Sequence, residues 1–340
     1  MKAIAPPLLT WYDNHRRDLP WRHQPGEPVN PWVVLVSEIM LQQTTVATIR
    51  TRFPLFLKQF PTPTALASTP VADVMAAWAG LGYYSRARNL HKATQTIIRD
   101  HQGQIPNNQS ALRQLPGIGN YTAAAVAAIA FNQPAVVVDS NIARIMTRLH
   151  AITHPLPGCM PTLIKLAGAQ TPTERPGCYA QALMDLGSLL CTARNPQCPQ
   201  CPLANQCDAY TQGIAHALPR KKAKSQRPVR EGIALVIFDP WDKHVWLQRR
   251  PSKGMLGGML AFPATSSWLD HIQASPAPNG YKCVPKSVRH IFSHFEAHIT
   301  VHYKTEQNPD FYGLWHPIDV PLPTVMKKIL SAAWQDRHNQ

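Results

Sequence analysis

Two acidic residues in apolar surroundings, Glu38 and Asp139, are the first candidates for chemistry. Glu38 lies within residues 33–41, a run that otherwise consists of Val, Leu, Ser, Ile and Met. If its side chain faced a pocket, desolvation would raise its pKa and let it hold a proton near neutral pH, as a general acid must. The simpler interpretation is a helix glutamate that faces solvent.

Asp139 follows the apolar run 135–138 and precedes a predicted helix that begins near Asn141. Its ordinary role would be to cap that helix, helped by Ser140. A cap aspartate that accepts backbone N–H groups stays ionised, because those donors favour the charged form. One protonated and one ionised carboxyl form the pair that cleaves glycosidic bonds through an oxocarbenium-like transition state.

Four cysteines are spaced as C-x6-C-x2-C-x5-C and could converge on one metal centre: Cys191, Cys198, Cys201 and Cys207. Such a set suits tetrahedral zinc or an iron–sulfur cluster. Zinc sites usually contain two C-x2-C pairs, whereas this segment contains one, so the spacing favours a cluster. We interpret Cys159, Cys178 and Cys283 as ordinary thiols.

A glycine-containing turn, Leu115–Gly119, precedes an alanine-rich predicted helix that starts near Tyr121. Gly117 and Gly119 allow a tight turn whose backbone N–H groups point outward, and beside a helix N-terminus this forms a cradle for DNA phosphates. An ordinary helix–helix turn is the alternative. No Gly-Lys-Ser/Thr follows, so a nucleotide-binding P-loop is excluded.

The elements that must position these residues divide the chain into a helical part and an α/β part. Within 1–215, helices are predicted over 33–53, 71–79, 86–99, 121–131, 141–149 and 179–191. After residue 230 the pattern changes to period two, with Phe295–Lys304 alternating between apolar and polar residues as in a half-buried strand. Residues 325–334 predict a closing helix.

The 340 residues contain 34 Lys plus Arg and 19 Asp plus Glu, a net charge of +15 that favours a polyanionic partner. Six basic residues lie in 219–230, which we interpret as an extended linker, either tracking phosphates or acting only as a tether. The longest apolar stretch, 123–131, is too short to span a membrane, and no signal peptide is evident. We therefore expect a cytoplasmic protein, nucleoid-associated in a bacterium.

Taken together, these features resemble the MutY adenine DNA glycosylases, members of the helix-hairpin-helix superfamily that includes endonuclease III. The resemblance covers nearly the whole chain and is carried by residues 18–22, 36–44, 80–90, 115–119, Asp139, 182–187, the four cysteines and 292–295. It implies a base excision repair enzyme that flips adenine out of a duplex, where the adenine is paired with 8-oxoguanine or G, and hydrolyses its N-glycosidic bond. It also implies a [4Fe–4S] cluster, double-stranded DNA as partner and a monomeric enzyme.

The resemblance also implies roles for individual residues. Glu38 would protonate adenine N7 and Asp139 would stabilise the cationic sugar carbon, assisted by Tyr121 and Asn141. The remaining matched positions are Arg22 and Asp185, which would line the adenine pocket, Gln43, Thr44, Leu81 and Tyr83, which would wedge into the duplex and meet 8-oxoguanine, and Ser293 and His294, which would read that lesion.

The implied fold has three parts. Residues 1–215 would form the helix-hairpin-helix glycosylase region, with a six-helix barrel over about 25–132 and a cluster lobe built from about 1–24 plus 133–215. Residues 216–230 would be the linker, and 231–340 an α/β Nudix-like domain that recognises 8-oxoguanine. Since no glutamate lies between Glu231 and Glu296, this domain lacks the carboxylates that a Nudix hydrolase needs for magnesium.

Two departures and two rival functions bear on this interpretation. The family's usual Asp-Gly-Asn is Asp139-Ser140-Asn141 here, and four extra residues lie between Arg22 and Glu38, around Pro25–Pro28. Endonuclease III-type enzymes carry a Schiff-base lysine where this chain has Tyr121, so we predict little strand-cutting lyase activity. The rivals are a glycosylase for oxidised pyrimidines and a non-catalytic DNA-binding or redox iron–sulfur protein.

Overall fold

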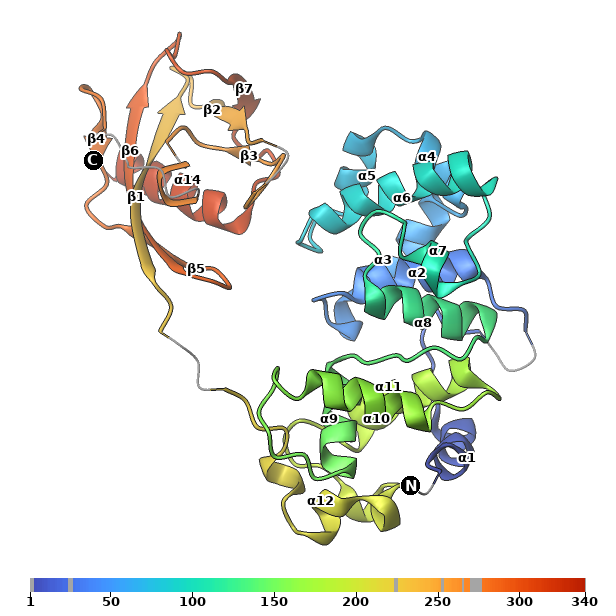
Figure 1. The fold of residues 1–340 in the computed structure, drawn as a ribbon. Coiled ribbons are helices and arrows are strands. Elements are labelled where there is room, and N and C mark those ends of the chain that lie inside the picture. The colour runs from blue at the N-terminus through green and yellow to red at the C-terminus, as the bar shows by residue number, and fades with distance from the viewer. Residues whose placement is uncertain are drawn as a thin grey trace. The chain divides into compact units, whose positions relative to one another are not determined.

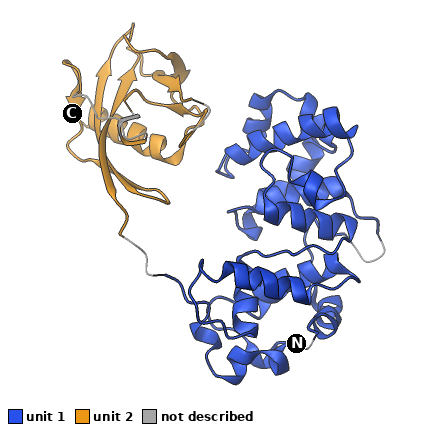
Figure 2. Ribbon diagram, in the orientation of Figure 1, with its two compact units in different colours: residues 1–223 blue, residues 224–340 orange. Residues whose placement is uncertain are grey.

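The computed structural model describes residues 3–23, 27–222, 226–251, 254–264, 266–269 and 277–339. The chain divides into two compact units, residues 1–223 and 224–340 (Figure 2). Unit 1 is helical, and unit 2 contains a sheet with helices (Figure 1). This confirms the predicted fold class. The extra residues expected around Pro25 lie partly outside the described residues.

The helices of unit 1 are mostly short, and several have Pro in their first turn. The α-helices are α1 Ala5–His15, α2 Pro31–Leu41, α3 Val46–Gln59, α4 Pro63–Ser68, α5 Val71–Ala77, α6 Ser85–His101, α7 Gln109–Leu112, α8 Asn120–Phe131, α9 Ser140–Leu149, α10 Met160–Gln170, α11 Pro176–Leu189 and α12 Asp208–Thr211. Three short 3-10 turns follow α11: Cys198–Gln200, Ala204–Gln206 and Ala215–Ala217.

The helix predicted over 33–53 is in fact two helices, α2 and α3, separated by a turn over 42–45. The Asn30 side chain caps α2 and the Thr45 side chain caps α3. Between them Gln43 has a φ of +55°, a left-handed conformation that interrupts the helix. No Gly or Pro marks this break, so helical propensity alone could not reveal it.

Helix α8 runs through the centre of unit 1. Residues 122–128 are all buried, which a chain of small alanines permits because neighbouring helices can approach on every side. Helix α2 packs against α8, and so does α11. Helix α1 lies beside α11, far along the chain, so the N-terminal segment packs with the helices that precede the cysteines (Figure 1).

Unit 2 is built on a sheet of seven strands among its described residues. The order is β3-β2-β1-β6-β4, with β5 on β6 and β7 on β2. The strands are β1 Val229–Phe238, β2 His244–Arg249, β3 Leu260–Ala261, β4 Lys282–Cys283, β5 Val288–Ile291, β6 Glu296–Thr305 and β7 Leu314–Pro317. The helices are α13 Ser266–Leu269 and α14 Thr324–His338.

The centre of the sheet is the parallel pair β1–β6, in the register Val229 to Glu296 through Phe238 to Thr305. The predicted alternation along β6 is observed, with Ala297, Ile299 and Val301 buried. Helix α14 packs against β1 and β6. The structure therefore places the period-two segment in the core of unit 2.

The segment expected as a linker, 216–230, is shorter than predicted at both ends. The Arg220 carbonyl accepts a hydrogen bond from Leu156 N at 2.9 Å, and Lys222 N donates to Leu156 O at 3.3 Å. These bonds attach 220–222 to unit 1, while β1 begins at Val229. Basic residues alone could not show this backbone pairing; Lys224 lies outside the described residues. No helix among the described residues is long and apolar enough to cross a membrane.

Candidate active site

Glu38 is buried on α2, with 6 % of its surface exposed, so the solvent-facing interpretation is wrong. Its carboxyl lines a pocket between α2 and α11. The other lining residues are Arg17, Leu19, Trp21, Arg22, Val34, Ser37, Leu41, Val46, Ile129, Gln181 and Met184. Burial raises the pKa of Glu38 to about 7, opposed by a hydrogen bond from Tyr121. A proton can therefore reside on Glu38 near neutral pH.

Tyr121 lies in the first turn of α8 and donates its hydroxyl hydrogen bond to Glu38. Burial raises the pKa of Tyr121, and the charges of Glu38 and Asp139 raise it further. The phenol thus stays protonated as a donor. The two carboxyl groups also interact directly, since the charge of Asp139 raises the pKa of Glu38.

Asp139 is the N-cap of α9, and its Oδ1 accepts from Ile142 N at 2.7 Å. Asn141 Nδ2 donates to Asp139 Oδ2 at 3.0 Å. Burial raises the pKa of Asp139 overall, although these donors lower it, so the sequence argument from donors alone omitted the larger cause. The cap role and the catalytic role are compatible, because the capping residue also lies near Tyr121 and Glu38.

The Arg144 side chain fixes the Asn141 side chain by a hydrogen bond and also bonds to α11. The guanidinium donates to Asn141 Oδ1 at 2.9 Å, to Gly187 O at 2.6 Å and to Cys191 O at 2.8 Å. A Cβ at Gly187 would lie 2.7 Å from the Asn141 Cβ, so only glycine lets α11 approach α9 this closely. Ser140 is the first residue of α9, where the backbone accommodates its side chain.

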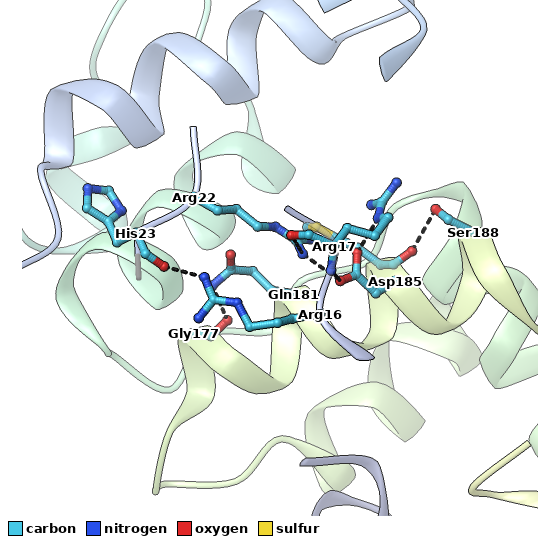
Figure 3. A network of polar contacts seen from close by, with 9 residues as sticks. Arg16, Arg17, Arg22, His23, Gly177, Gln181, Asp185 and Ser188 are labelled. Carbon is cyan, nitrogen blue, oxygen red and sulfur yellow. Dashed lines mark hydrogen bonds and ion pairs between the residues drawn. The ribbon is translucent and has the colours of Figure 1, made fainter. Parts of the chain in front are cut away.

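Arg22 and Asp185 form a bidentate ion pair, with Nη1–Oδ2 at 2.5 Å and Nη2–Oδ1 at 2.7 Å (Figure 3). Arg17 binds the same carboxylate through Nε at 2.5 Å and through its backbone N at 3.0 Å. Burial acts to raise the pKa of Asp185, but the Arg22 and Arg17 guanidinium groups outweigh it and hold the pKa below its ordinary value. Asp185 is fully buried behind the arginines, which themselves line the pocket.

Among the residues that line this pocket, only Arg22 and Glu38 were proposed from the sequence as site residues; those missed include Arg17, Trp21 and Gln181. The Gln181 side chain lies one helical turn before Asp185 on α11 and donates to Gly177 O at 3.2 Å (Figure 3). Spacing of four on a helix places residues on one face, so Gln181 could have been inferred once Asp185 was chosen. Arg17 and Trp21 lie within or beside the matched run 18–22.

The glycine turn connects α7 to α8. Gly117 has a φ of +78°, and a Cβ there would lie 2.6 Å from Asn89 Cβ, so both conformation and space require glycine. Gly119 is the N-cap residue of α8, and no side chain caps the helix. The first N–H groups of α8 are therefore available to an anion.

The four residues expected to wedge into a duplex occupy two turns, 42–45 and 79–84. Gln43 and Tyr83 are exposed, with φ of +55° and +44°. Leu81 is buried and Thr44 is half-buried. Each turn thus exposes one of these side chains, Gln43 or Tyr83. Thr44 and Leu81 are less accessible and pack within the turns.

The four cysteines line one small pocket with Arg148, Leu190, Pro196, Gln197, Ala204, Tyr210 and Ala215. Burial raises the pKa of Cys201 to about 12, and the nearby thiols contribute. Among the described residues no three His, Cys, Asp or Glu side chains are placed to hold a single metal ion. Four thiols around one pocket fit the ligand set of an iron–sulfur cluster.

Ser293 and His294 are exposed at the tip of the β5–β6 hairpin in unit 2. Phe292 N donates to Phe295 O at 2.9 Å and closes the turn. Phe292 and Phe295 stack with ring centroids 4.7 Å apart, which anchors the tip to the sheet. The hydroxyl and imidazole are therefore presented to solvent on a supported turn.

Comparison with known proteins agrees with this arrangement. The model of the HhH-GPD superfamily of base excision DNA repair proteins matches residues 36–165, the iron–sulfur binding domain of endonuclease III matches 191–207, and a NUDIX domain matches 233–332. A solved thermostable thymine-DNA glycosylase is 29 % identical with a TM-score of 0.54, covering 61 % of this chain and 94 % of its own. A solved endonuclease III–DNA complex, 24 % identical with a TM-score of 0.51, shares the fold.

Curated relatives extend the similarity to both units. The adenine DNA glycosylase of Buchnera aphidicola (subsp. Schizaphis graminum) is 31 % identical, covering 95 % of this chain and 96 % of its own. The human adenine DNA glycosylase is 32 % identical over 95 % of this chain and 69 % of its own. With a helical glycosylase unit, an iron–sulfur domain that contains a [4Fe–4S] cluster and a Nudix-like domain in one chain, this protein belongs to the adenine DNA glycosylases of base excision repair.

Proposed function

We propose that the enzyme hydrolyses the N-glycosidic bond of adenine paired with 8-oxoguanine, and also with G, in double-stranded DNA. The observation that carries this proposal is Glu38, a pocket carboxyl whose pKa lies at about 7 beside a second, hydrogen-bonded carboxylate. Adenine is a poor leaving group as an anion, so a proton donor in the base pocket is the group the reaction needs. The relatives' printed name, adenine DNA glycosylase, supports adenine as the base.

In this mechanism the adenine is flipped into the pocket, and protonated Glu38 transfers its proton to adenine N7. The bond from the base to C1′ then breaks with its electrons moving to the base, leaving a cationic sugar carbon. Asp139 stabilises that cation, either as an ion pair or as a transient covalent bond. Glu38, now ionised, takes a proton from the attacking water, which restores the acid.

The neighbours of the two carboxylates support their different roles. Glu38 receives one hydrogen bond, from Tyr121, whereas Asp139 accepts from Ile142 N, Asn141 N and Asn141 Nδ2. More donors favour the charged form, so Asp139 is the better anion and Glu38 the better acid. Arg17 and Arg22, held by Asp185, give the pocket donors that can orient the base.

The cluster would be held by Cys191, Cys198, Cys201 and Cys207. When bound, the cluster would form iron–thiolate bonds to these cysteines and so cross-link the segments that follow α11. Because glycosidic hydrolysis moves no electrons, we assign the cluster a structural or DNA-positioning role. The N–H groups around Gly117 and Gly119 would bind a phosphate of the same duplex.

We further propose that Ser293 and His294 read the 8-oxoguanine, and that one chain suffices for activity. The hairpin tip exposes a hydroxyl and an imidazole, which can donate to or accept from a modified guanine edge. A monomer in solution, measured by light scattering, is the expected state.

The assay that tests the proposal offers the enzyme three duplexes: A opposite 8-oxoguanine, A opposite G, and thymine glycol opposite A. We expect adenine release from the first two and no release of thymine glycol. Release of thymine glycol without release of adenine would favour the oxidised-pyrimidine glycosylase. Binding without release of any base would favour a non-catalytic DNA-binding protein.

Strand cutting separates hydrolysis from lyase chemistry. Tyr121 stands where a Schiff-base lysine would be, and none of the described residues that line the pocket is a lysine. We therefore expect the product strand to remain intact until alkali is added. Nicking without alkali at a rate that matches base release would contradict a monofunctional mechanism.

A further inference from the structure

The Arg86 side chain, near the start of α6, is buried and donates several hydrogen bonds, and neither the fold nor the proposed mechanism has yet given it a role. Its Nη1 donates to the carbonyls of Ile39 at 3.1 Å and Met40 at 2.8 Å. Its Nη2 lies within hydrogen-bond distance of Leu81 O at 3.0 Å, Gly82 O at 3.2 Å and Thr44 Oγ1 at 3.1 Å. These acceptors belong to three segments: helix α2, the turn 42–45 and the turn 79–84.

The three segments have one property in common, which is that each carries a residue proposed to act on the mispair, either on the adenine or on the 8-oxoguanine. The carbonyls of Ile39 and Met40 belong to the last turn of α2, one and two residues after Glu38. Thr44 is adjacent to Gln43, and Gly82 is adjacent to Tyr83. Both of these exposed neighbours have left-handed backbones, at φ of +55° and +44°. Such conformations cost roughly 1 kcal/mol each in non-glycine residues and persist only when nearby contacts hold them.

We propose that Arg86 is a positioning residue that couples the two duplex-facing turns to the helix bearing Glu38. Its planar guanidinium spans acceptors in three segments, which a single ammonium group cannot do. The ring of Trp78 lies 5.3 Å and that of Tyr83 5.7 Å from the guanidinium carbon, which fixes its plane. Insertion of Tyr83 at the lesion would thus be transmitted to the position of the general acid. This inference rests on the proposed wedge role of the turns.

A double-mutant cycle with Arg86→Lys and Tyr83→Ala tests the coupling. Single-turnover adenine release is measured on the 8-oxoguanine duplex for the wild type, both single variants and the double variant. Arg86→Lys should slow release about tenfold, as expected for the loss of a charged hydrogen bond. If Arg86 acts through the Tyr83 turn, the Arg86→Lys substitution should slow adenine release by less than about twofold when it is made in the Tyr83→Ala enzyme.

Matched variants separate positioning from folding. Arg99→Lys on the same helix, with an exposed side chain, should leave the rate unchanged. Thr44→Val removes one acceptor of Arg86 and tests the same coupling if Arg86→Lys folds poorly; its loss of rate should also shrink in the Tyr83→Ala background.

The outcomes of the cycle are distinct. The inference would be overturned if Arg86→Lys, or Thr44→Val, slowed release equally in the wild-type and Tyr83→Ala enzymes. It would also be overturned if the substitution slowed release in neither enzyme. Tyr83→Ala that alone leaves the rate unchanged would instead refute the wedge role.

Discussion

At the scale of single residues, the protonation state of each buried carboxyl group depends on the hydrogen-bond donors and positive charges around it. Glu38 has one hydrogen-bond donor and a pKa raised to about 7, whereas the fully buried Asp185 is paired with two arginines and has a lowered pKa. In water the two side chains would have similar ordinary pKa values, 4.5 for the glutamate and 3.8 for the aspartate. Contacts therefore make one carboxyl an acid and the other a fixed anion that positions Arg17 and Arg22.

Glu38→Gln should stabilise the protein at pH 8 and change little at pH 5. The pKa of Glu38 is raised from 4.5 to about 7, so the folded state binds the proton more tightly than the unfolded state, and stability falls as pH rises between these values. A shift of about 2.5 units corresponds to up to about 3 kcal/mol. Thermal unfolding at both pH values checks this; equal melting temperatures for the two proteins at pH 8 would contradict the raised pKa.

Asp185→Asn should destabilise unit 1 by about 3 kcal/mol or more, because two guanidinium groups would lose a buried counter-charge. The matched control is Asp13→Asn, which breaks the exposed pair with Arg175 and should cost under about 1 kcal/mol. Urea unfolding of both variants measures the difference. Equal losses would show that the buried pair has no special role.

At the scale of elements, Glu38 lies within a helix, whereas other groups of the proposed site lie at turns and helix ends. The proposed phosphate cradle depends on the α7–α8 turn, and the position of Asp139 depends on the start of α9. Helix ends are where backbone donors remain free, which explains why these sites lie there.

The two glycines of the cradle make a matched pair of variants. Gly117→Ala should lower stability by at least about 1 kcal/mol and weaken DNA binding, since the Cβ meets Asn89 and φ is +78°. A Cβ at Gly119 meets nothing within 4 Å, so Gly119→Ala should keep the melting temperature. If the turn binds phosphate, Gly119→Ala should still weaken binding in a fluorescence titration. Unchanged affinity would remove the cradle from the DNA interface.

Most helices and the strand β6 could be predicted from periodicity, and Glu38 and Asp139 from their apolar neighbours. The break over 42–45 could not be predicted, because hydrogen bonds from Arg86 to Thr44 and from Gln42 to Thr122 act across distant sequence. The Arg22–Asp185 pair joins residues 163 positions apart, so its contact is a product of the fold. The position of Asp185 behind the two arginines also results from the fold and could not be predicted from the local sequence.

At the scale of the whole molecule, the chain has two units with separate cores, and we propose that unit 1 performs the chemistry and unit 2 the recognition. The +15 charge supports attachment to DNA without sequence discrimination. The segment 220–222 is fixed to unit 1, so its cations belong to the surface of that unit. We propose that discrimination between 8-oxoguanine and G belongs to unit 2.

The double variant Ser293→Ala/His294→Ala should reduce the preference for A opposite 8-oxoguanine over A opposite G by about tenfold, the value of roughly one specific contact. Release from the A·G duplex should change little. Tyr312→Ala, at another exposed position of unit 2, is the control. Equal slowing on both duplexes would assign the tip a role in general DNA binding.

The most direct measurement is the single-turnover rate of adenine release from the 8-oxoguanine duplex between pH 5 and 9, for the wild type and Glu38→Gln. With Glu38 as the acid, the wild-type rate should fall as pH rises through about 7, because the proton is lost. Glu38→Gln should bind the duplex and release adenine at least about 100-fold more slowly. Adenine release by Glu38→Gln at the wild-type rate would contradict the account.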